Sequence, residues 1–170
     1  STLGGDTRPD GLSSPGAYAD FAEQGLEIGY PAYKMHGWHA GDPKEEIPML
    51  RAVSERVGDR MDIMYDSSSN LKTFADAVKV GKVCDELGFY WLEDPFADGG
   101  ISINAHRRLK EHVKTPILIT EFVRNAESTI DIVSAGASDF GRVDPDYDGG
   151  LTGCLKVAYA CETLGMDCEV

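Results

Sequence analysis

Apolar and polar positions along the chain follow one repeating cycle, in which a short apolar run leads into a polar loop and then an amphipathic helix. The apolar runs predict strands at residues 33–36, 62–66, 89–93, 116–120, 139–143 and 166–170. The amphipathic stretches predict helices from residue 13 or 14 to about 24, and at 43–57, 71–87, 102–112, 126–135 and 152–164. Strands alternating with helices indicate a parallel sheet covered by helices, either an open doubly wound sheet or a β/α barrel. Periodicity alone does not choose between them.

Residues that favour helix ends lie at several of these boundaries. Ser13 or Ser14 is expected to cap the first helix, because a short hydroxyl side chain can accept a hydrogen bond from the first turn. Gly88 lies where the third helix would end in a left-handed residue. Thr152 is expected to cap the last helix after a tight glycine turn.

Three of the predicted strands end in a carboxylate. Asp66, Glu93 and Glu121 follow successive apolar runs, at intervals of 27 and 28 residues. Each interval is about one strand–helix unit, so the three side chains are expected to lie together at the carboxyl edge of neighbouring parallel strands, where such folds build their sites. Without a common site, they would be solvated loop acids of an acidic protein.

A cluster of three carboxylates has a specific electrostatic requirement. The like charges raise one another's pKa unless a cation neutralises them. Ligands that offer only oxygen select a hard ion, most plausibly Mg²⁺, with positions left open for water or substrate oxygens. The pattern therefore predicts a magnesium site formed by Asp66, Glu93 and Glu121.

Two further strand ends carry candidate catalytic groups. Lys34 and His36 alternate in the first predicted strand, so they project to the same side of the sheet. A divalent cation beside them would lower the pKa of each group, which suits a general base at neutral pH. Two ordinary solvent-exposed side chains at the end of a strand would explain the pair equally well. Asp144 follows the fifth predicted strand in the same way.

Composition limits the partners. The 170 residues include 16 Lys and Arg against 29 Asp and Glu, a formal net charge of −13, which argues against nucleic acid or an anionic membrane as a partner. No apolar run approaches the roughly 18–20 residues needed to span a bilayer, and the first residues show no signal-peptide pattern. With four cysteines and no secretory features, the expected location is cytoplasmic, with reduced thiols.

Taken together, the motifs resemble the enolase superfamily, specifically its mandelate racemase/muconate lactonizing branch. The Trp-Leu-Glu-Asp-Pro run at residues 91–95 is the strongest match and looks like the second metal-ligand strand of that branch. Asp66 and Glu121 match the first and third ligands in position and spacing. The Lys-Met-His run at residues 34–36 aligns with the family's Lys-x-Lys, and Asp144 falls where racemase-like members carry the Asp of a His–Asp dyad.

The resemblance implies a mechanism. Mg²⁺ held by Asp66, Glu93 and Glu121 would bind a substrate carboxylate, a base would remove the α-proton, and the metal would stabilise the enediolate, as the superfamily's sites do. An acid sugar would then lose its β-hydroxyl as water and give a 2-keto-3-deoxy acid. Racemisation, epimerisation or cycloisomerisation could occur on the same platform. The partner would be a small carboxylate, and the full-length enzyme would be a homo-oligomer.

The sequence also departs from the family pattern. His36 replaces the second Lys of the family pair, so His36 or Lys34 must act as the base, and the altered base favours dehydration over racemisation. The dyad histidine would lie after Val170. A complete barrel needs about 250 residues, so residues 1–170 are expected to form an incomplete TIM-type β/α barrel whose first strand precedes Ser1. The capping domain and the last strands would lie outside the chain.

Other interpretations remain open at this level. A receiver-like doubly wound signalling module that binds Mg²⁺ beside a phosphorylated Asp has a suitable length and charge, although its acids would cluster early in the chain. A family member or fragment that keeps only the scaffold is also possible. His36 and His39 could form a zinc site, and in the family interpretation Trp38 and His39 would line the pocket. Arg124 could bind a substrate carboxylate or form a surface salt bridge.

Overall fold

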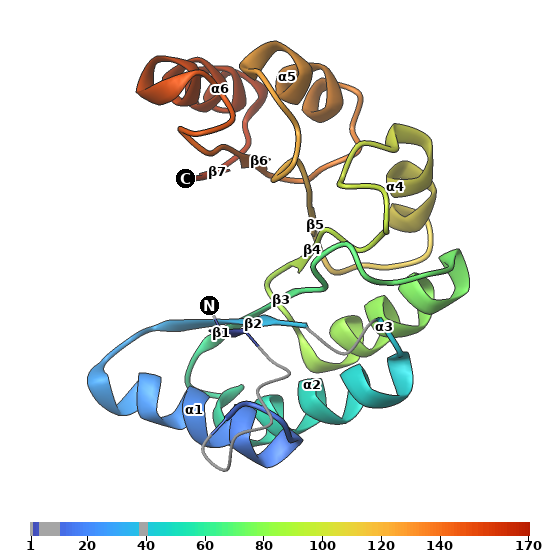
Figure 1. Cartoon of the computed structure of the whole chain (residues 1–170), viewed down its shortest axis with the longest axis vertical. Coiled ribbons are helices and arrows are strands. Elements are labelled where there is room, and N and C mark those ends of the chain that lie inside the picture. Colours follow the sequence, from blue (N-terminus) through green and yellow to red (C-terminus); the bar gives the residue numbers. More distant parts are fainter. Residues whose placement is uncertain (1, 4–10, 38–40) are drawn as a thin grey trace.

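The computed structural model describes residues 2–3, 11–37 and 41–170. Within these residues, strands and helices alternate along the chain (Figure 1). The strands are β1 (Thr2–Leu3), β2 (Ala32–His36), β3 (Asp62–Asp66), β4 (Leu92–Glu93), β5 (Ile117–Leu118), β6 (Gly141–Arg142) and β7 (Cys168–Glu169). The helices are α1 (Pro15–Ile28), α2 (Pro43–Val57), α3 (Phe74–Leu87), α4 (Ile103–Lys110), α5 (Ala126–Ser134) and α6 (Gly150–Leu164).

The order of the strands decides between the two architectures. Strands β1 to β5 form one parallel sheet in chain order, and β6 pairs with β7 in a separate parallel ladder. Figure 1 shows the strands as an arc with the helices on its outer side. A doubly wound sheet would instead reverse its strand order at a switch point and carry helices on both faces. The described chain is therefore a β/α-barrel type of fragment, and its strands do not close into a complete hydrogen-bonded ring.

Side chains continue the sheet where the backbone ladder stops between β5 and β6. The Ser138 hydroxyl accepts a hydrogen bond from the Ile119 N–H at 3.2 Å and donates one to the Ile117 carbonyl at 3.1 Å. The Asp139 carboxylate accepts the Ile117 N–H at 2.8 Å, and the Asp139 N–H returns a bond to the Ile117 carbonyl. These contacts hold the two-stranded ladder against the end of the five-stranded sheet.

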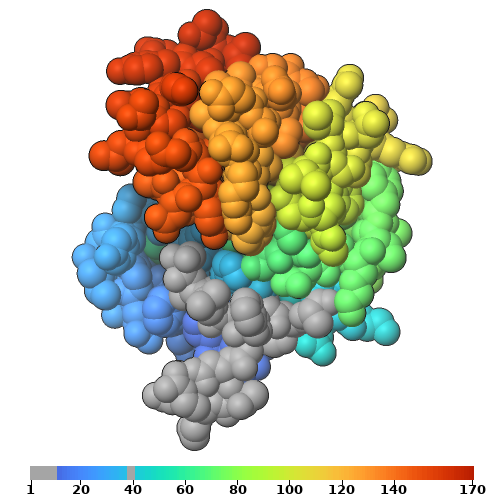
Figure 2. Space-filling model, turned by 45° about the horizontal axis from the view of Figure 1, so that its top comes forward, coloured from blue at the N-terminus to red at the C-terminus, as the bar shows by residue number. Residues whose placement is uncertain are grey.

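The apolar core has two parts that follow the same division. The larger cluster lies between β2–β5 and the helices α1 to α4, and includes the fully buried Tyr65 and Leu92. A smaller cluster beneath α5 and α6 centres on Val157 and Cys161. Figure 2 shows the C-terminal helices packed directly against the rest of the molecule. Among the described residues, no helix has both the length and the apolar character needed to cross a bilayer.

Several helix boundaries differ from the sequence-based expectation. Helix α1 continues beyond residue 24 to Ile28 and ends at Gly29 in the left-handed conformation, because its buried face packs along α2. Helix α3 begins only at Phe74, where the Thr73 hydroxyl accepts the Asp76 N–H. The predicted caps at Ser14 and Gly88 are confirmed.

The expectation for the turn before the last helix is wrong. Thr152 does not cap α6, which begins two residues earlier after a left-handed Gly149. At the start of the described chain, Thr2 and Leu3 pair with Met35 and His36 of β2, so residues of the first strand lie within the chain. A two-residue strand carries no alternation of apolar and polar positions, so the sequence pattern could not predict it.

Candidate metal centre

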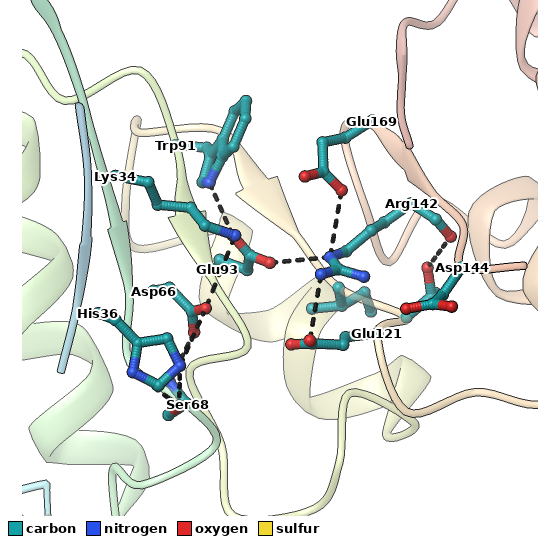
Figure 3. Close-up of polar contacts among 12 residues, drawn as sticks. Lys34, His36, Asp66, Ser68, Trp91, Glu93, Glu121, Arg142, Asp144 and Glu169 are labelled. Carbon is teal, nitrogen blue, oxygen red and sulfur yellow. Dashed lines mark hydrogen bonds and ion pairs between the residues drawn. The ribbon is translucent and has the colours of Figure 1, made fainter. Parts of the chain in front are cut away.

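The parallel register places the candidate groups in one row at the carboxyl edge of the sheet. His36 pairs with Asp66, and Asp66 pairs with Glu93, so the ends of three neighbouring strands lie level. Glu121 follows β5, the next strand in the sheet. The side chains of Asp66, Glu93 and Glu121 converge, with one carboxylate oxygen from each lying within 4.8 Å of the others (Figure 3). We refer to these three residues as the carboxylate triad.

The triad is largely withdrawn from water. Glu93 is fully buried and Asp66 is 2% exposed, whereas Glu121 is more open. Burial raises the pKa of Asp66 to about 7, and repulsion from Glu93 adds to the rise. The charge of Lys34 and the Ser68 N–H, which donates to Asp66 Oδ1 at 2.7 Å, oppose that rise. An acid held in this state gains from any cation placed beside it.

Lys34 binds the triad from the β2 side. Its Nζ donates to Glu93 Oε2 at 2.8 Å and lies 3.8 Å from Asp66 Oδ2. The Trp91 indole N–H donates to the same Glu93 oxygen at 3.0 Å. Burial by itself would lower the pKa of Lys34, but the attraction and hydrogen bond of Glu93 outweigh it and raise the pKa above its usual value. Lys34 is therefore charged in this arrangement.

His36 lies beside Asp66 on the same edge. Its Nε2 is 2.6 Å from the Ser68 hydroxyl and 3.6 Å from Asp66 Oδ2. Burial lowers the pKa of the imidazole, and the nearby charge of Lys34 lowers it further. His36 is thus a neutral ring at neutral pH, able to accept a proton next to the triad.

Arg142 binds the triad from the opposite side, and the sequence pattern did not single it out. Its Nε donates to Glu93 Oε1 at 2.9 Å, and its Nη2 lies 3.1 Å from Glu121 Oε1. The same Nε is 3.2 Å from Oε2 of Glu169 on β7 (Figure 3). The available signal was weak: Arg142 lies two positions before Asp144, which places both side chains on the same side of an extended strand.

Asp144 and Arg124 are not part of the triad's contacts. The Asp144 carboxylate accepts the Asp146 N–H at 2.8 Å, and the Asp144 N–H donates to Asp148 Oδ2 at 3.0 Å, so Asp144 shapes the turn before α6. The Arg124 guanidinium lies over the Tyr147 ring at 3.6 Å. Neither residue has a described hydrogen bond or ion pair to the triad.

The other sequence signals end elsewhere. Trp38 and His39 lie outside the described residues. Cys154 and Cys161 are buried in the smaller core as free thiols, and Cys168 is partly buried on β7. In the ranges that the structure describes, the triad is the sole group of three or more acidic, histidine or cysteine side chains arranged to hold a metal ion.

Two residues beside the triad have unusual backbone conformations. Asp94 has φ +39° and Thr120 has φ +98°, in the left-handed region that side chains rarely adopt. Each is next to a triad member in the chain, and the Thr120 hydroxyl donates to the Arg142 carbonyl at 3.0 Å. Such strain concentrates at functional sites, where the surrounding structure fixes a side-chain direction.

The chemistry of this donor set fits Mg²⁺. All three triad donors are carboxylate oxygens, which a hard divalent ion prefers. The charged network consists of four carboxylates and two cations, namely Asp66, Glu93, Glu121 and Glu169 with Lys34 and Arg142. With all six groups ionised, the network carries two excess negative charges, and one divalent cation would balance them.

Comparisons with known proteins agree with this geometry. A family model described as Enolase C-terminal domain-like matches residues 17–170. The chain is 26% identical over 159 residues to an N-succinyl-L-Arg/Lys racemase of Bacillus cereus, covering 94% of this chain and 42% of the racemase. It is 27% identical over 122 residues to an arabinonate dehydratase of Saccharolobus solfataricus, covering 72% of this chain and 32% of the dehydratase.

Solved structures give the same picture. The crystal structure of D-glucarate dehydratase from Agrobacterium tumefaciens complexed with magnesium superposes with a TM-score of 0.88 at 28% identity. That superposition covers 98% of this chain and 44% of the dehydratase chain. The chain thus spans less than half the length of these relatives.

Proposed function

Because this chain belongs to the enolase C-terminal domain-like family, we propose that its full-length protein removes the proton α to a carboxylate in an Mg²⁺-dependent reaction. The specific reaction would be the dehydration of an acid sugar to a 2-keto-3-deoxy acid. The observation that carries the proposal is the convergence of Asp66, Glu93 and Glu121 within 4.8 Å, with Lys34 and His36 on the same edge. The similarity to two acid-sugar dehydratases supports the choice of reaction.

Asp66, Glu93 and Glu121 would hold the magnesium ion. When bound, Mg²⁺ would neutralise the negative charge that develops on the substrate carboxylate as the α-proton leaves. The buried side of the triad excludes water from Glu93 and Asp66, which strengthens every electrostatic interaction at that edge. Glu121 is the most exposed member of the triad and therefore marks the side from which a small carboxylate would approach.

His36 would take up the α-proton at a ring nitrogen. The lowered pKa keeps the imidazole neutral and ready to accept a proton. Ser68 and Asp66 both approach Nε2 and orient the ring. Lys34, held in its charged form by Glu93, would face the negative charge of the substrate.

Asp144 would act indirectly. In the resemblance it orients a dyad histidine, which would have to come from outside residues 1–170. The same interpretation makes this chain part of a β/α-barrel catalytic domain, completed in the full-length protein by further strands and a capping domain. The coverage of 42% and 44% of a racemase and a dehydratase supports this organisation.

The test is a screen of acid sugars with the full-length protein in Mg²⁺, with detection of 2-keto products. Glu93→Gln is the matched control, since it removes one charge from the triad while keeping the side-chain size. We expect one or a few sugars to give keto product with the wild type and none with Glu93→Gln. Equal turnover by both proteins would refute the site assignment.

A racemase or epimerase is the second candidate, because the chain is similar to an N-succinyl-L-Arg/Lys racemase over 94% of its length. The two reactions share the proton removal and differ in the fate of the enediolate. Exchange of the α-proton with solvent deuterium, without keto product, would identify racemisation or epimerisation. Keto product from the same substrate would identify dehydration.

A further inference from the structure

Arg142 reaches the triad from outside the five-stranded sheet. It lies on β6, in the separate ladder with β7, and its side chain is 11% exposed. Its guanidinium contacts two triad members at once, with Nε 2.9 Å from Glu93 Oε1 and Nη2 3.1 Å from Glu121 Oε1. One side chain therefore pairs with two of the three carboxylates that would hold a metal.

In this arrangement both oxygens of Glu93 accept hydrogen bonds from donors of the protein. Lys34 and Trp91 both donate to Oε2, and Arg142 donates to Oε1. A divalent cation bound to Glu93 and Glu121 would lie close to the guanidinium, and the two like charges would repel each other. The geometry makes the guanidinium and the metal competitors for the same two side chains.

A further partner for the guanidinium, outside the triad, is Glu169. Oε2 of Glu169 is 3.2 Å from Arg142 Nε, in an ion pair without hydrogen-bond geometry, and Glu169 is not a triad member. The backbone of Arg142 is fixed by the pairing with β7 and by the Thr120 hydroxyl on its carbonyl. The guanidinium therefore already lies between Glu93 and Glu169, and a change of its side chain alone would release the triad while it keeps an acidic partner.

We propose that Arg142 is a resident counter-cation, which holds Glu93 and Glu121 together in the metal-free protein and is displaced toward Glu169 when a divalent cation binds. The proposal rests on the proposed function, because it takes the triad as the metal site. It assigns Arg142 a positioning role that is separate from proton transfer. Arg142 stabilises the empty triad and weakens the affinity for the metal.

The test measures two quantities in Arg142→Gln, the thermal unfolding midpoint without metal and the Mg²⁺ dissociation constant from calorimetry. Removing a cation in direct contact with Glu93 and Glu121 should tighten Mg²⁺ binding by about tenfold or more while lowering the metal-free midpoint. A purely structural role would weaken both properties together. Arg142→Lys should give intermediate values, because an ammonium is a single point charge without the guanidinium fork.

Two further variants make the result specific. Arg51→Gln removes the same charge from an exposed pair with Glu86, and should leave Mg²⁺ affinity unchanged. Glu169→Gln removes the second partner of the guanidinium, and should weaken Mg²⁺ binding several-fold. Unchanged or weaker binding in Arg142→Gln, or in Arg142→Lys if the first variant does not fold, would overturn the proposal. If the wild type binds no Mg²⁺, the proposed metal site fails as well, so the two failures are distinguishable.

Discussion

Glu93 is paired with a cation on each of its two sides, and the two cations are held in place by different parts of the structure. On one side, Lys34 lies on β2 and Glu93 lies on β4. The strand between β2 and β4 is β3, which pairs with both of them in the continuous sheet. On the other side, Arg142 comes from β6, which is joined to the sheet through contacts of Ser138 and Asp139, most of them made by side chains. The Lys34 side is therefore fixed by backbone register. The Arg142 side depends on individual side chains.

This difference predicts separate roles for the two cations. A cation held rigidly by register can serve chemistry, because its position relative to the reacting atoms is maintained. A cation on a more weakly attached ladder, with a second acid within reach, can move as the site fills. Substitutions that separate the two sides should change different measurable properties.

The largest expected effect is loss of turnover in Lys34→Met. Removing the ammonium from the reacting edge should lower kcat/KM by about 100-fold to 10,000-fold, the usual range for a residue that supports proton transfer. Mg²⁺ binding should persist, since the triad remains complete. Steady-state kinetics of the full-length protein and calorimetry measure the two effects. Near-normal turnover would show that the register-fixed cation takes no part in the chemistry.

The next effect concerns the charge of Asp66, which lies on the Lys34 side of the triad. The pKa of Asp66 is raised from 3.8 to about 7 in the folded chain, so between these values the folded state keeps a proton that the unfolded chain has released. Metal-free stability must therefore fall as pH rises through this window. Asp66→Asn, which can still accept the Ser68 N–H, should remove that fall and add roughly 2 to 4 kcal/mol at about pH 8.

Denaturant unfolding of both proteins at about pH 5 and pH 8 measures the difference. The same variant should lose Mg²⁺ binding, because an amide replaces an ionised ligand. Equal destabilisation of Asp66→Asn at the two pH values would contradict the raised pKa, and would assign Asp66 a packing role instead.

The sequence predicted which groups on the Lys34 side lie together. Parallel pairing makes spacing along the chain predictive, because Asp66 and Glu93 lie one strand–helix unit apart and end level in the sheet. The register of Lys34 and His36 follows from the alternation within one strand. These features depend on backbone geometry, which the pattern of residue types along the chain reflects directly.

The Arg142 side could not be predicted in the same way. β6 and β7 are two residues long, and their contact with β5 runs mostly through side chains whose partners are not encoded in periodicity. An arginine in a loop-like stretch carries no sign that three acids from other strands surround it. For the same reason Asp144, placed correctly after β6, was not predicted to shape a turn.

A smaller effect should appear when the Arg142 side is disturbed through its backbone. Gly141 pairs with Cys168, and a Cβ at position 141 would overlap the Cys161 sulfur and lie 3.3 Å from the Cys168 sulfur. Gly141→Ala should therefore cost about 1 to 3 kcal/mol of stability through overpacking. Calorimetric or denaturant unfolding measures the loss.

Cys161→Ala is the compensating variant for Gly141→Ala, since it removes the sulfur atom that the new methyl group would overlap. In the double variant the cost of Gly141→Ala should shrink, giving a favourable coupling energy. Strictly additive losses would show that the thiol is not the cause. Lys34 contacts should be unaffected in all three proteins, which keeps the comparison of the two sides intact.

The smallest effect tests the loop that follows Glu93 in the chain. His106 on α4 is fully buried, with its ring against Phe96 at 4.9 Å and its Nδ1 2.8 Å from the Ser102 carbonyl. Burial lowers the pKa of His106 in the folded chain, so the unfolded chain binds a proton first as pH falls below about 6.5. The contribution of His106 to stability is therefore present above that pH and is lost below it, by at most about 1.4 kcal/mol per pH unit.

His106→Phe should remove this part of the acid sensitivity while the Ser102 carbonyl keeps its bond from the backbone N–H of residue 106. Because carboxylates also titrate in this range, the quantity to measure is the difference in unfolding free energy between wild type and variant from about pH 7 to pH 5. A difference that stays constant across that range would mean that His106 does not bind a proton on unfolding, and that its ring acts only by filling space under the loop.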